Sequence, residues 1–321
     1  MSTTASTPSP AVALAEALDD WSPGAVHTAR RVDPWQAAAF AALIDAPAPS
    51  LGWGDPLPPL WHWFTLLDHP AHAELGADGH PADGAFLPPI PGRRRMFAGG
   101  RYRRHRPIPV GAELGCRSSL ADVAVKHGRT GELAFVTVRH ELSVARTPVG
   151  VEEQDIVYRS EPDGSARSRP AAPPPAVAPS TAAPTTAGWR LTLPTDPVRL
   201  FRFSALTYNG HRIHYDEPYA TAVEGYPGLV VHGPLLALLA LELPRRHAPG
   251  ETVTEFAYRL VRPAFAGAVI EATADRDGSA VDIVVGARGA GASLTATAIL
   301  APTPPRTSPA SVVGADEEGA P

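Results

Sequence analysis

Two periods of apolar and polar residues run along the chain, and each predicts a different kind of element. Residues 133–145 (LAFVTVRHELSVA) alternate between apolar and polar positions, which predicts a strand with one buried face. Residues 233–243 (GPLLALLALEL) are apolar at nearly every position, which predicts a helix that is buried on all sides. Residues 33–44 predict a second helix, in which Asp33 is the N-cap and Pro34 lies in the first turn.

The remaining predicted elements follow the same order in both halves of the chain, with helical segments before strands. The apolar residues 60–67 (LWHWFTLL) predict a short helix, and GRTG at 128–131 predicts a hairpin turn. Further strands are predicted at residues 101–106, 113–127, 252–262, 268–276, 280–287 and 292–300. An apolar helix followed by antiparallel strands indicates a sheet curled around a central helix, and two such units indicate an internal duplication.

Segment 160–188 separates the two halves. It consists almost entirely of Pro, Ala, Ser, Thr and Gly, a composition that cannot bury enough apolar surface to fold and that its prolines keep extended. We therefore expect an N-terminal domain at 11–159, a linker at 160–188 and a C-terminal domain at 189–301. Residues 1–10 and 302–321 are expected to be disordered.

Composition narrows the class of protein. The chain has 321 residues, of which 44% are hydrophobic and 19% charged, as in soluble globular proteins. Its net charge of -5 argues against nucleic acid as a partner, and no apolar run approaches the roughly 18 residues that a membrane span needs. The single cysteine, Cys116, excludes a disulfide framework and suits a reducing cytoplasm. Arginine in place of nearly all lysine, with abundant Ala and Pro, is typical of a GC-rich bacterial genome.

Candidate chemistry is concentrated in residues 201–220, which read FRFSALTYNGHRIHYDEPYA. Titratable and polar residues between apolar elements are typical of a functional site, although a solvated loop would have a similar composition. Downstream, Gly233 opens the predicted buried helix, where unpaired backbone N–H groups could bind a carbonyl oxygen. The alternative is that Gly233 only allows close packing.

Together these two segments resemble the MaoC-like, R-specific enoyl-CoA hydratases, whose motif runs Gly-Asp-x-Asn-Pro-Ile-His before a helix opened by His-Gly. In the matching string YNGHRIH, His214 falls on the family's catalytic histidine and Asn209 on its catalytic aspartate. The family's asparagine, proline and His-Gly pair correspond to His211, Arg212 and His232–Gly233. Because an amide cannot act as a base, Asn209 is a departure from the wider family.

That departure indicates a subgroup. The strings SALTYNGHRIHYDEPYA and GRRRMFAGGRYRRHRPIPVG (92–111) resemble mesaconyl-C(4)-CoA hydratases, itaconyl-CoA hydratases and mitochondrial hydroxyacyl-thioester dehydratases type 2. The resemblance implies an α+β double hotdog fold and a homodimer without metal or other cofactor. It implies a hydro-lyase acting on a 2-enoyl or 3-hydroxyacyl thioester of CoA or of an acyl-carrier protein.

The resemblance also implies a mechanism. His214 would be the general base toward water, since the ordinary pKa of a histidine, about 6.5, lies near the working pH. Asn209 would orient that water, and the N–H of Gly233 would bind the enolate oxygen. The expected substrate contacts are Tyr208, His211, Arg212, Tyr215 and His232.

The role of the arginines is open. Seven lie between Arg93 and Arg106, and Arg101 and Arg104 are candidates for binding the phosphates of CoA or an acidic carrier protein. A solvated strand face would show the same pattern. Arg212 could pair with the free carboxylate of a dicarboxylic acyl group such as mesaconyl or itaconyl, or with Asp216.

Other readings concern a loop and the class of reaction. The His/Asp-rich stretch 68–80 has Gly and Pro between its candidate ligands, which favours a surface loop over a metal site. A carrier-protein dehydratase, a hotdog thioesterase and a non-catalytic acyl-binding subunit are the competing functions. A thioesterase would need a carboxylate near the central helix, where Glu242 lies at the far end.

Overall fold

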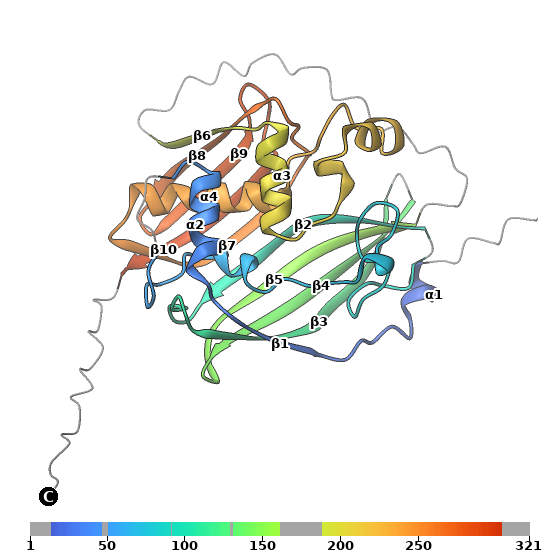
Figure 1. The fold of residues 1–321 in the computed structure, drawn as a ribbon, viewed down its shortest axis with the longest axis horizontal. Coiled ribbons are helices and arrows are strands. Elements are labelled where there is room, and N and C mark those ends of the chain that lie inside the picture. Colours follow the sequence, from blue (N-terminus) through green and yellow to red (C-terminus); the bar gives the residue numbers. More distant parts are fainter. Residues whose placement is uncertain (1–13, 47–50, 91, 129–130, 161–187, 304–321) are drawn as a thin grey trace, which may run out of the picture.

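The computed structural model describes residues 14–46, 51–90, 92–128, 131–160 and 188–303. Within them, ten strands form one antiparallel sheet with the order β1-β3-β4-β5-β2-β7-β10-β9-β8-β6 (Figure 1). The predicted disordered ends and most of the predicted linker lie outside the described residues.

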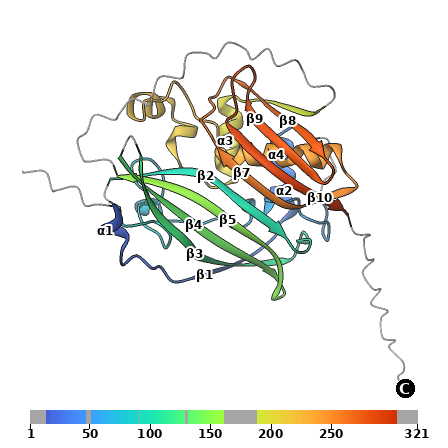
Figure 2. The same ribbon diagram turned by 180° about the vertical axis from the view of Figure 1, so that it is seen from behind.

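Each half of the chain contributes five strands to the sheet. The N-terminal strands are β1 (Val26–Arg31), β2 (Arg93–Arg104), β3 (Glu113–Gly128), β4 (Gly131–Val144) and β5 (Thr147–Ser160). The C-terminal strands are β6 (Trp189–Pro194), β7 (Glu251–Leu260), β8 (Val269–Asp277), β9 (Ala280–Ala287) and β10 (Leu294–Pro302). The two sets join where β2 lies beside β7, as Figure 2 shows from behind. In this pair, Gly99 is opposite Arg259 and Arg103 is opposite Glu255.

The C-terminal strands pack around the helix α4 (Gly233–His247). Its residues Leu235 to Pro244 are all buried, as the apolar run predicts. The helix continues past the predicted end at Leu243 because its last turn is held by ion pairs: Glu242 bonds Arg245 at 2.5 Å and Arg246 at 3.1 Å. In the described part of the chain, no helix has the length and apolarity that crossing a membrane requires.

The N-terminal strands have a much shorter element where α4 would have its counterpart. The helix predicted at 60–67 is a four-residue 3-10 helix, η1 (Trp61–Phe64). It cannot extend toward the N-terminus because Leu60 takes a left-handed conformation (φ 65°) directly before it. The prediction of a central helix in each half is therefore correct for the C-terminal half and wrong for the N-terminal half.

Two further helices cover the core between the halves. α2 (Pro34–Leu43) begins as predicted, with the Asp33 side chain accepting from the N–H of Trp35 at 2.7 Å. It packs against α3 (Pro197–Leu206), which leads directly into the NGHRIH loop. The smaller helices are α1 (Leu14–Leu18), η2 (His72–Glu74), η3 (Arg212–His214) and η4 (Tyr219–Val223).

The strands predicted by alternation are present within a few residues of their expected bounds, apart from β2, which begins at Arg93 rather than at residue 101. Strands β1, β5 and β6 were not predicted. The hairpin turn at 128–131 is closed by the pairing of Gly128 with Gly131, while residues 129–130 lie outside the described part.

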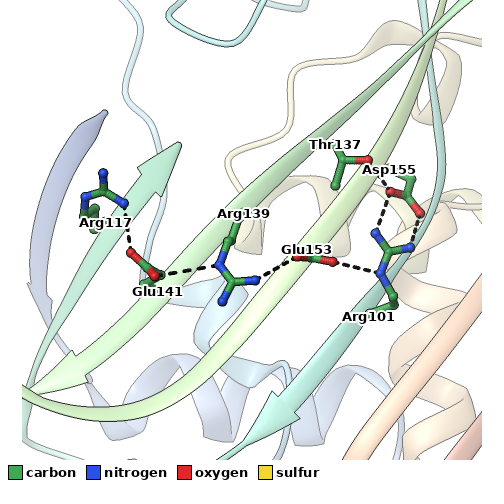
Figure 3. A network of polar contacts seen from close by, with 7 residues as sticks. All are labelled: Arg101, Arg117, Thr137, Arg139, Glu141, Glu153 and Asp155. Carbon is green, nitrogen blue, oxygen red and sulfur yellow. Dashed lines mark hydrogen bonds and ion pairs between the residues drawn. The ribbon is translucent and has the colours of Figure 1, made fainter. Parts of the chain in front are cut away.

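The two faces of the N-terminal sheet carry different polar groups. On the outer face, ion pairs link Arg117 to Glu141, Arg139 to Glu153, and Arg101 to both Glu153 and Asp155, as Figure 3 shows. The alternation of side chains turns their neighbours to the opposite face, which lines the cavity of the protein. These inner residues are Cys116, Ser118, His140, Glu152 and Gln154.

Candidate active site

A cavity of about 1860 Å³ lies between the two halves and receives side chains from both. The C-terminal half contributes the NGHRIH loop and Gly233, whereas the N-terminal half contributes η1, the start of β2 and the inner faces of β3 to β5. Its volume exceeds that of ordinary small-ligand pockets, roughly 300–1,000 Å³, so a long flexible ligand can enter it.

His214 lies on η3 with its ring in the wall of this cavity. Its Nδ1 is 2.7 Å from the carbonyl oxygen of Val230, to which it must donate. That bond fixes the tautomer and leaves Nε2 as an acceptor. Burial lowers the pKa of His214 to about 4, against a smaller opposite effect of the Val230 bond. The histidine is therefore neutral at pH 7 and able to act as a base, and its pKa lies well below the ordinary value of 6.5 that we expected from the sequence.

His232 stacks on the ring of His214. The two rings stack with centroids 3.7 Å apart and planes 18° apart, and Nε2 of His232 lies 2.8 Å from Oγ of Ser204. His232 is fully buried and does not line the cavity, so the structure places it behind the His214 ring rather than in contact with the cavity, where a substrate contact was expected.

Gly233 opens α4 beside His214. The next residue is Pro234, which has no N–H, so Gly233 carries the backbone N–H that begins α4, and both residues line the cavity. A Cβ on Gly233 would lie 2.5 Å from Cδ1 of Leu260 and 3.4 Å from Cδ1 of Phe97. Both neighbours also line the cavity, so a side chain at position 233 would intrude on the site.

Asn209 has its side-chain oxygen engaged within the loop. Oδ1 accepts from the backbone N–H of His211 at 2.9 Å, and the preceding residue, Tyr208, is left-handed with φ 50°. The Asn209 oxygen thus shapes the turn that carries His211 and His214. If Asn209 orients a water, it does so through its amide N–H groups.

The other loop residues brace the site or border it. The Arg212 guanidinium bonds Asp216 at 2.7 and 2.9 Å and the Ala77 carbonyl at 3.0 Å, and it lies 3.9 Å above the Tyr219 ring. Of the two alternatives for Arg212, the structure shows the pair with Asp216. Tyr208 and Tyr215 border the cavity with exposed side chains, and the Tyr215 hydroxyl donates to the Gly210 carbonyl at 3.0 Å.

A segment that the sequence placed on the surface lies in the site. His80 packs on His211 with ring centroids 3.9 Å apart, and His211 meets His214 edge to face at 5.3 Å. His80 is bonded to Asp78 at 3.1 Å. The stretch 68–80 is therefore not simply a surface loop, because its end docks onto the NGHRIH loop.

The same residues are the candidate metal ligands. Donor atoms of Asp78, His80 and His211 lie within 4.8 Å of one another. Among the residues that the structure describes, these three form the cluster of His, Cys, Asp or Glu side chains that could hold a metal ion. One carboxylate oxygen and two imidazole nitrogens are a donor set that suits several divalent metals.

A second buried polar cluster lies on the N-terminal side of the cavity. Glu152 is 2% exposed and accepts from Nε2 of His62 at 2.6 Å and from Nε1 of Trp63 at 2.8 Å. Burial alone would raise the pKa of Glu152, but the His62 bond and charge outweigh it and lower the pKa. His140 bonds Ser118 at 2.8 Å nearby. The part of the cavity that the N-terminal half forms is thus polar, and the sequence did not predict this cluster.

The arginines divide between the cavity and the outer surface. Arg101 is held in the outer ion-pair network and Arg104 bonds Thr252, so neither lines the cavity and their assignment to CoA binding stays a prediction. Arg93 and Arg94 do line it, but Arg93 bonds two carbonyls and Arg94 pairs with Glu224. Arg95 also lines the cavity and has no hydrogen bond or ion pair among the residues that the structure describes.

Comparisons with known proteins give a consistent family. The sequence model of the family described as hydroxyacyl-thioester dehydratase type 2 matches residues 60–266 of this chain. A mesaconyl-C(4)-CoA hydratase of Chloroflexus aurantiacus is 43% identical over 82% of this chain and 90% of the relative. A mitochondrial hydroxyacyl-thioester dehydratase type 2 of Schizosaccharomyces pombe is 28% identical over 65% of this chain and 74% of the relative.

The fold is shared with solved structures at low identity. A protein of Mycobacterium tuberculosis described as a double hotdog fold has a TM-score of 0.54 and 15% identity, covering 88% of this chain and 98% of that one. The double hotdog expected from the sequence is confirmed. Glu242, the carboxylate of α4, is paired with arginines and does not line the cavity, which disfavours a thioesterase. The chain belongs to the hydroxyacyl-thioester dehydratase type 2 family and is an acyl-thioester hydro-lyase.

Proposed function

We propose that the protein hydrates a short 2-enoyl-CoA of the mesaconyl type, whose acyl group carries a free carboxylate in addition to the thioester. The observation that carries this is the 43% identity to a mesaconyl-C(4)-CoA hydratase along most of both chains. A cavity with buried polar groups at its N-terminal end supports a polar acyl group over a long hydrocarbon chain.

The proposed reaction begins at His214. Its Nε2 takes a proton from water while the water oxygen bonds to the β-carbon of the enoyl group. The π electrons of the double bond move toward the thioester, whose oxygen becomes an enolate that the Gly233 N–H stabilises. The proton that His214 Nε2 took up then passes to the α-carbon and His214 returns to its neutral form, so that one water has been added and no charge is left over.

Arg95 is the group we assign to the acyl carboxylate. It pairs with Tyr158 across β2 and β5 on the inner face of the sheet, and its charge lowers the pKa of His211, so it lies close to the NGHRIH loop. A guanidinium in a cavity is a good match for a carboxylate in geometry and charge. Arg212, bonded to Asp216, is the weaker candidate.

The finer features of the protein are proposals as well. CoA rather than a carrier protein, a homodimer, a bacterial source and a cytoplasmic location all follow from the resemblance and the composition. Sedimentation velocity of the purified chain tests the dimer. Assay of matched CoA and carrier-protein thioesters tests the carrier.

The substrate is tested by measuring kcat/KM for mesaconyl-C(4)-CoA and crotonyl-CoA, which lacks the carboxylate, from the loss of enoyl absorbance. In Arg95→Gln we expect kcat/KM for mesaconyl-C(4)-CoA to fall about 10- to 100-fold, the usual value of a hydrogen bond between charged groups, with little change for crotonyl-CoA. Arg103→Gln is the matched control, since Arg103 is 65% exposed and pairs with Glu255 outside the cavity. Wild-type preference for crotonyl-CoA would contradict the proposed substrate.

A further inference from the structure

One arginine in the wall of the cavity comes from the same half of the chain as His214 and Gly233. It is Arg262, which lies two residues after the end of β7. Among the described residues, the other arginines that line the cavity belong to the N-terminal half: Arg30, Arg93, Arg94 and Arg95. Arg262 is thus the guanidinium that belongs to the same half as the proposed reaction centre.

Arg262 lies near Gly233, at a point where the cavity opens to solvent. Leu260, the last residue of β7, is so close to Gly233 that a Cβ on the glycine would lie 2.5 Å from Cδ1 of the leucine. Two residues of extended chain span roughly 7 Å, so the backbone of Arg262 is close to the start of α4. Both neighbours of Arg262 also line the cavity, and both are exposed: Val261, at 55%, and Pro263. The cavity therefore meets solvent beside Arg262.

The Arg262 side chain is held in place by the turn between β9 and β10. Its Nε donates to the carbonyl oxygen of Ala292 at 2.9 Å. The guanidinium lies where a side chain at Gly291 would be, since a Cβ on Gly291 would lie 2.9 Å from Cζ of the arginine and still closer to Nη2. The turn is itself anchored to the end of β7, because the Ser293 carbonyl accepts from the N–H of Val261 at 2.8 Å. The side chain is therefore ordered before any ligand binds, which favours binding.

The terminal nitrogens of Arg262 are available to a ligand. Among the residues that the structure describes, neither Nη1 nor Nη2 makes a hydrogen bond and no carboxylate pairs with the guanidinium. A guanidinium presents its N–H groups as a planar fork that can bind a phosphate through two parallel hydrogen bonds. Arg262 is therefore an open anion site beside the opening of the cavity.

The position of Arg262 indicates which anion of the substrate it meets. In the proposed mechanism the thioester oxygen lies at the N–H of Gly233, and the carboxylate of the acyl group is assigned to Arg95 in the N-terminal half. The pantetheine arm leaves the thioester on the other side and has to reach solvent. In CoA and in a carrier protein alike, this arm ends in a phosphate ester.

We propose that Arg262 binds the phosphate that is joined directly to the pantetheine arm of the substrate. The turn between β9 and β10 holds the guanidinium in place for this contact. The inference rests on the proposed position of the thioester at Gly233 and not on the identity of the acyl group.

Kinetics with three crotonyl thioesters test the proposal. They are the thioesters of CoA, of phosphopantetheine, which keeps only this phosphate, and of pantetheine, which has none. In Arg262→Gln we expect KM to rise about tenfold for the first two, as for a charge-assisted hydrogen bond at a partly exposed site, with little change for the third. Arg288→Gln is the matched control and should keep the wild-type KM, because Arg288 is 58% exposed in the same turn and does not line the cavity.

Gly291→Ala separates the charge from its position. The variant keeps Arg262 but places a methyl group where the guanidinium lies, so KM should rise for the same two thioesters, and an unchanged KM would show that the turn does not position the arginine. In Arg262→Gln, equal rises for all three thioesters would assign the effect to packing and overturn the proposal. An unchanged KM would also overturn it, as would a rise for the CoA thioester without one for the phosphopantetheine thioester.

The same variants distinguish the two sources of the phosphate. If KM in Arg262→Gln rises for the phosphopantetheine and CoA thioesters but not for crotonyl carrier protein, the site binds CoA; a rise for the carrier-protein thioester in place of the CoA thioester assigns the site to a carrier. Calorimetric titration of wild type and Arg262→Gln with CoA, phosphopantetheine and pantetheine needs no turnover. Binding through Arg262 in a protein that does not hydrate mesaconyl-C(4)-CoA would therefore contradict only the proposed substrate.

Discussion

The lowered pKa of His214 leads to a prediction about activity in mild acid. The base form has to be neutral, and burial holds its pKa at about 4. At pH 5.5 a group with that pKa is about 97% neutral, whereas an ordinary histidine, with a pKa of about 6.5, would be only about 9% neutral. We therefore expect kcat/KM to be nearly the same at pH 5.5 as at pH 7, where an exposed histidine would lose about tenfold.

The assay is the initial rate of hydration at low substrate concentration, since kcat/KM reports the ionisation of the free enzyme. Crotonyl-pantetheine is the suitable substrate, because it has no carboxylate or nucleotide phosphate that titrates in this range. Circular dichroism at pH 5.5 and recovery of the rate on return to pH 7 control for acid unfolding. A tenfold fall of kcat/KM at pH 5.5 in the folded protein would refute the assignment of His214 as a buried neutral base.

Other consequences of the site can be measured separately. His214→Gln should lower kcat by about 10²–10⁴-fold in the hydration assay, and a folded variant with the wild-type rate would exclude His214 as the base. Gly79→Ala should lower kcat and the melting temperature together, because its Cβ would lie 1.9 Å from the Gly210 carbonyl oxygen; unchanged values would show that the two loops can separate freely. Asn209→Asp should keep the turn at His211, while Asn209→Ala should cost about 1 kcal/mol of unfolding free energy through the lost hydrogen bond; urea titration of both variants distinguishes them, and equal loss would mean that the turn does not depend on the side-chain oxygen. The pKa of His214 is about 4 in the folded protein and about 6.5 in the unfolded chain, so between these pH values the unfolded state binds more protons. The contribution of His214 to the unfolding free energy should therefore fall by about 2 kcal/mol when the pH is lowered from 7 to 5. Urea titrations at the two pH values check this, because His214→Gln should lack that part of the pH dependence.

The local pattern of apolar and polar residues was sufficient to predict an element where the structure of that segment depends mainly on its own sequence. The apolar run that begins at Gly233 predicted α4, and Asp33 with Pro34 predicted the start of α2. Strand β5 could not be recognised in this way, because its centre reads Glu-Glu-Gln-Asp, residues 152–155. Those side chains are tolerated in a strand because Arg101 and Arg139 neutralise one face and His62 the other.

The site shows the same division. The sequence predicted the NGHRIH loop and Gly233 as site residues because each lies in a short segment whose residue types are typical of a functional site. The docking of His80 onto His211 joins positions 131 residues apart, and neither string alone indicates the other. The informative signal was Gly79: a left-handed glycine between Asp78 and His80 permits a backbone contact that no other residue allows there.

The two halves have the same plan but unequal contents, and the inequality makes the site possible. The C-terminal sheet is filled by α4, which spans Gly233–His247, so its interior has no room for a substrate. The N-terminal sheet holds only the four residues of η1 in the corresponding place, and the cavity extends over its inner face instead. A helix as long as α4 in both halves would close the cavity, whereas η1 in both halves would remove the helix N-terminus at Gly233, to which the proposed mechanism assigns the enolate oxygen. The short element in the N-terminal half thus leaves space for the cavity, which is lined by His80, Glu152 and His214 alike.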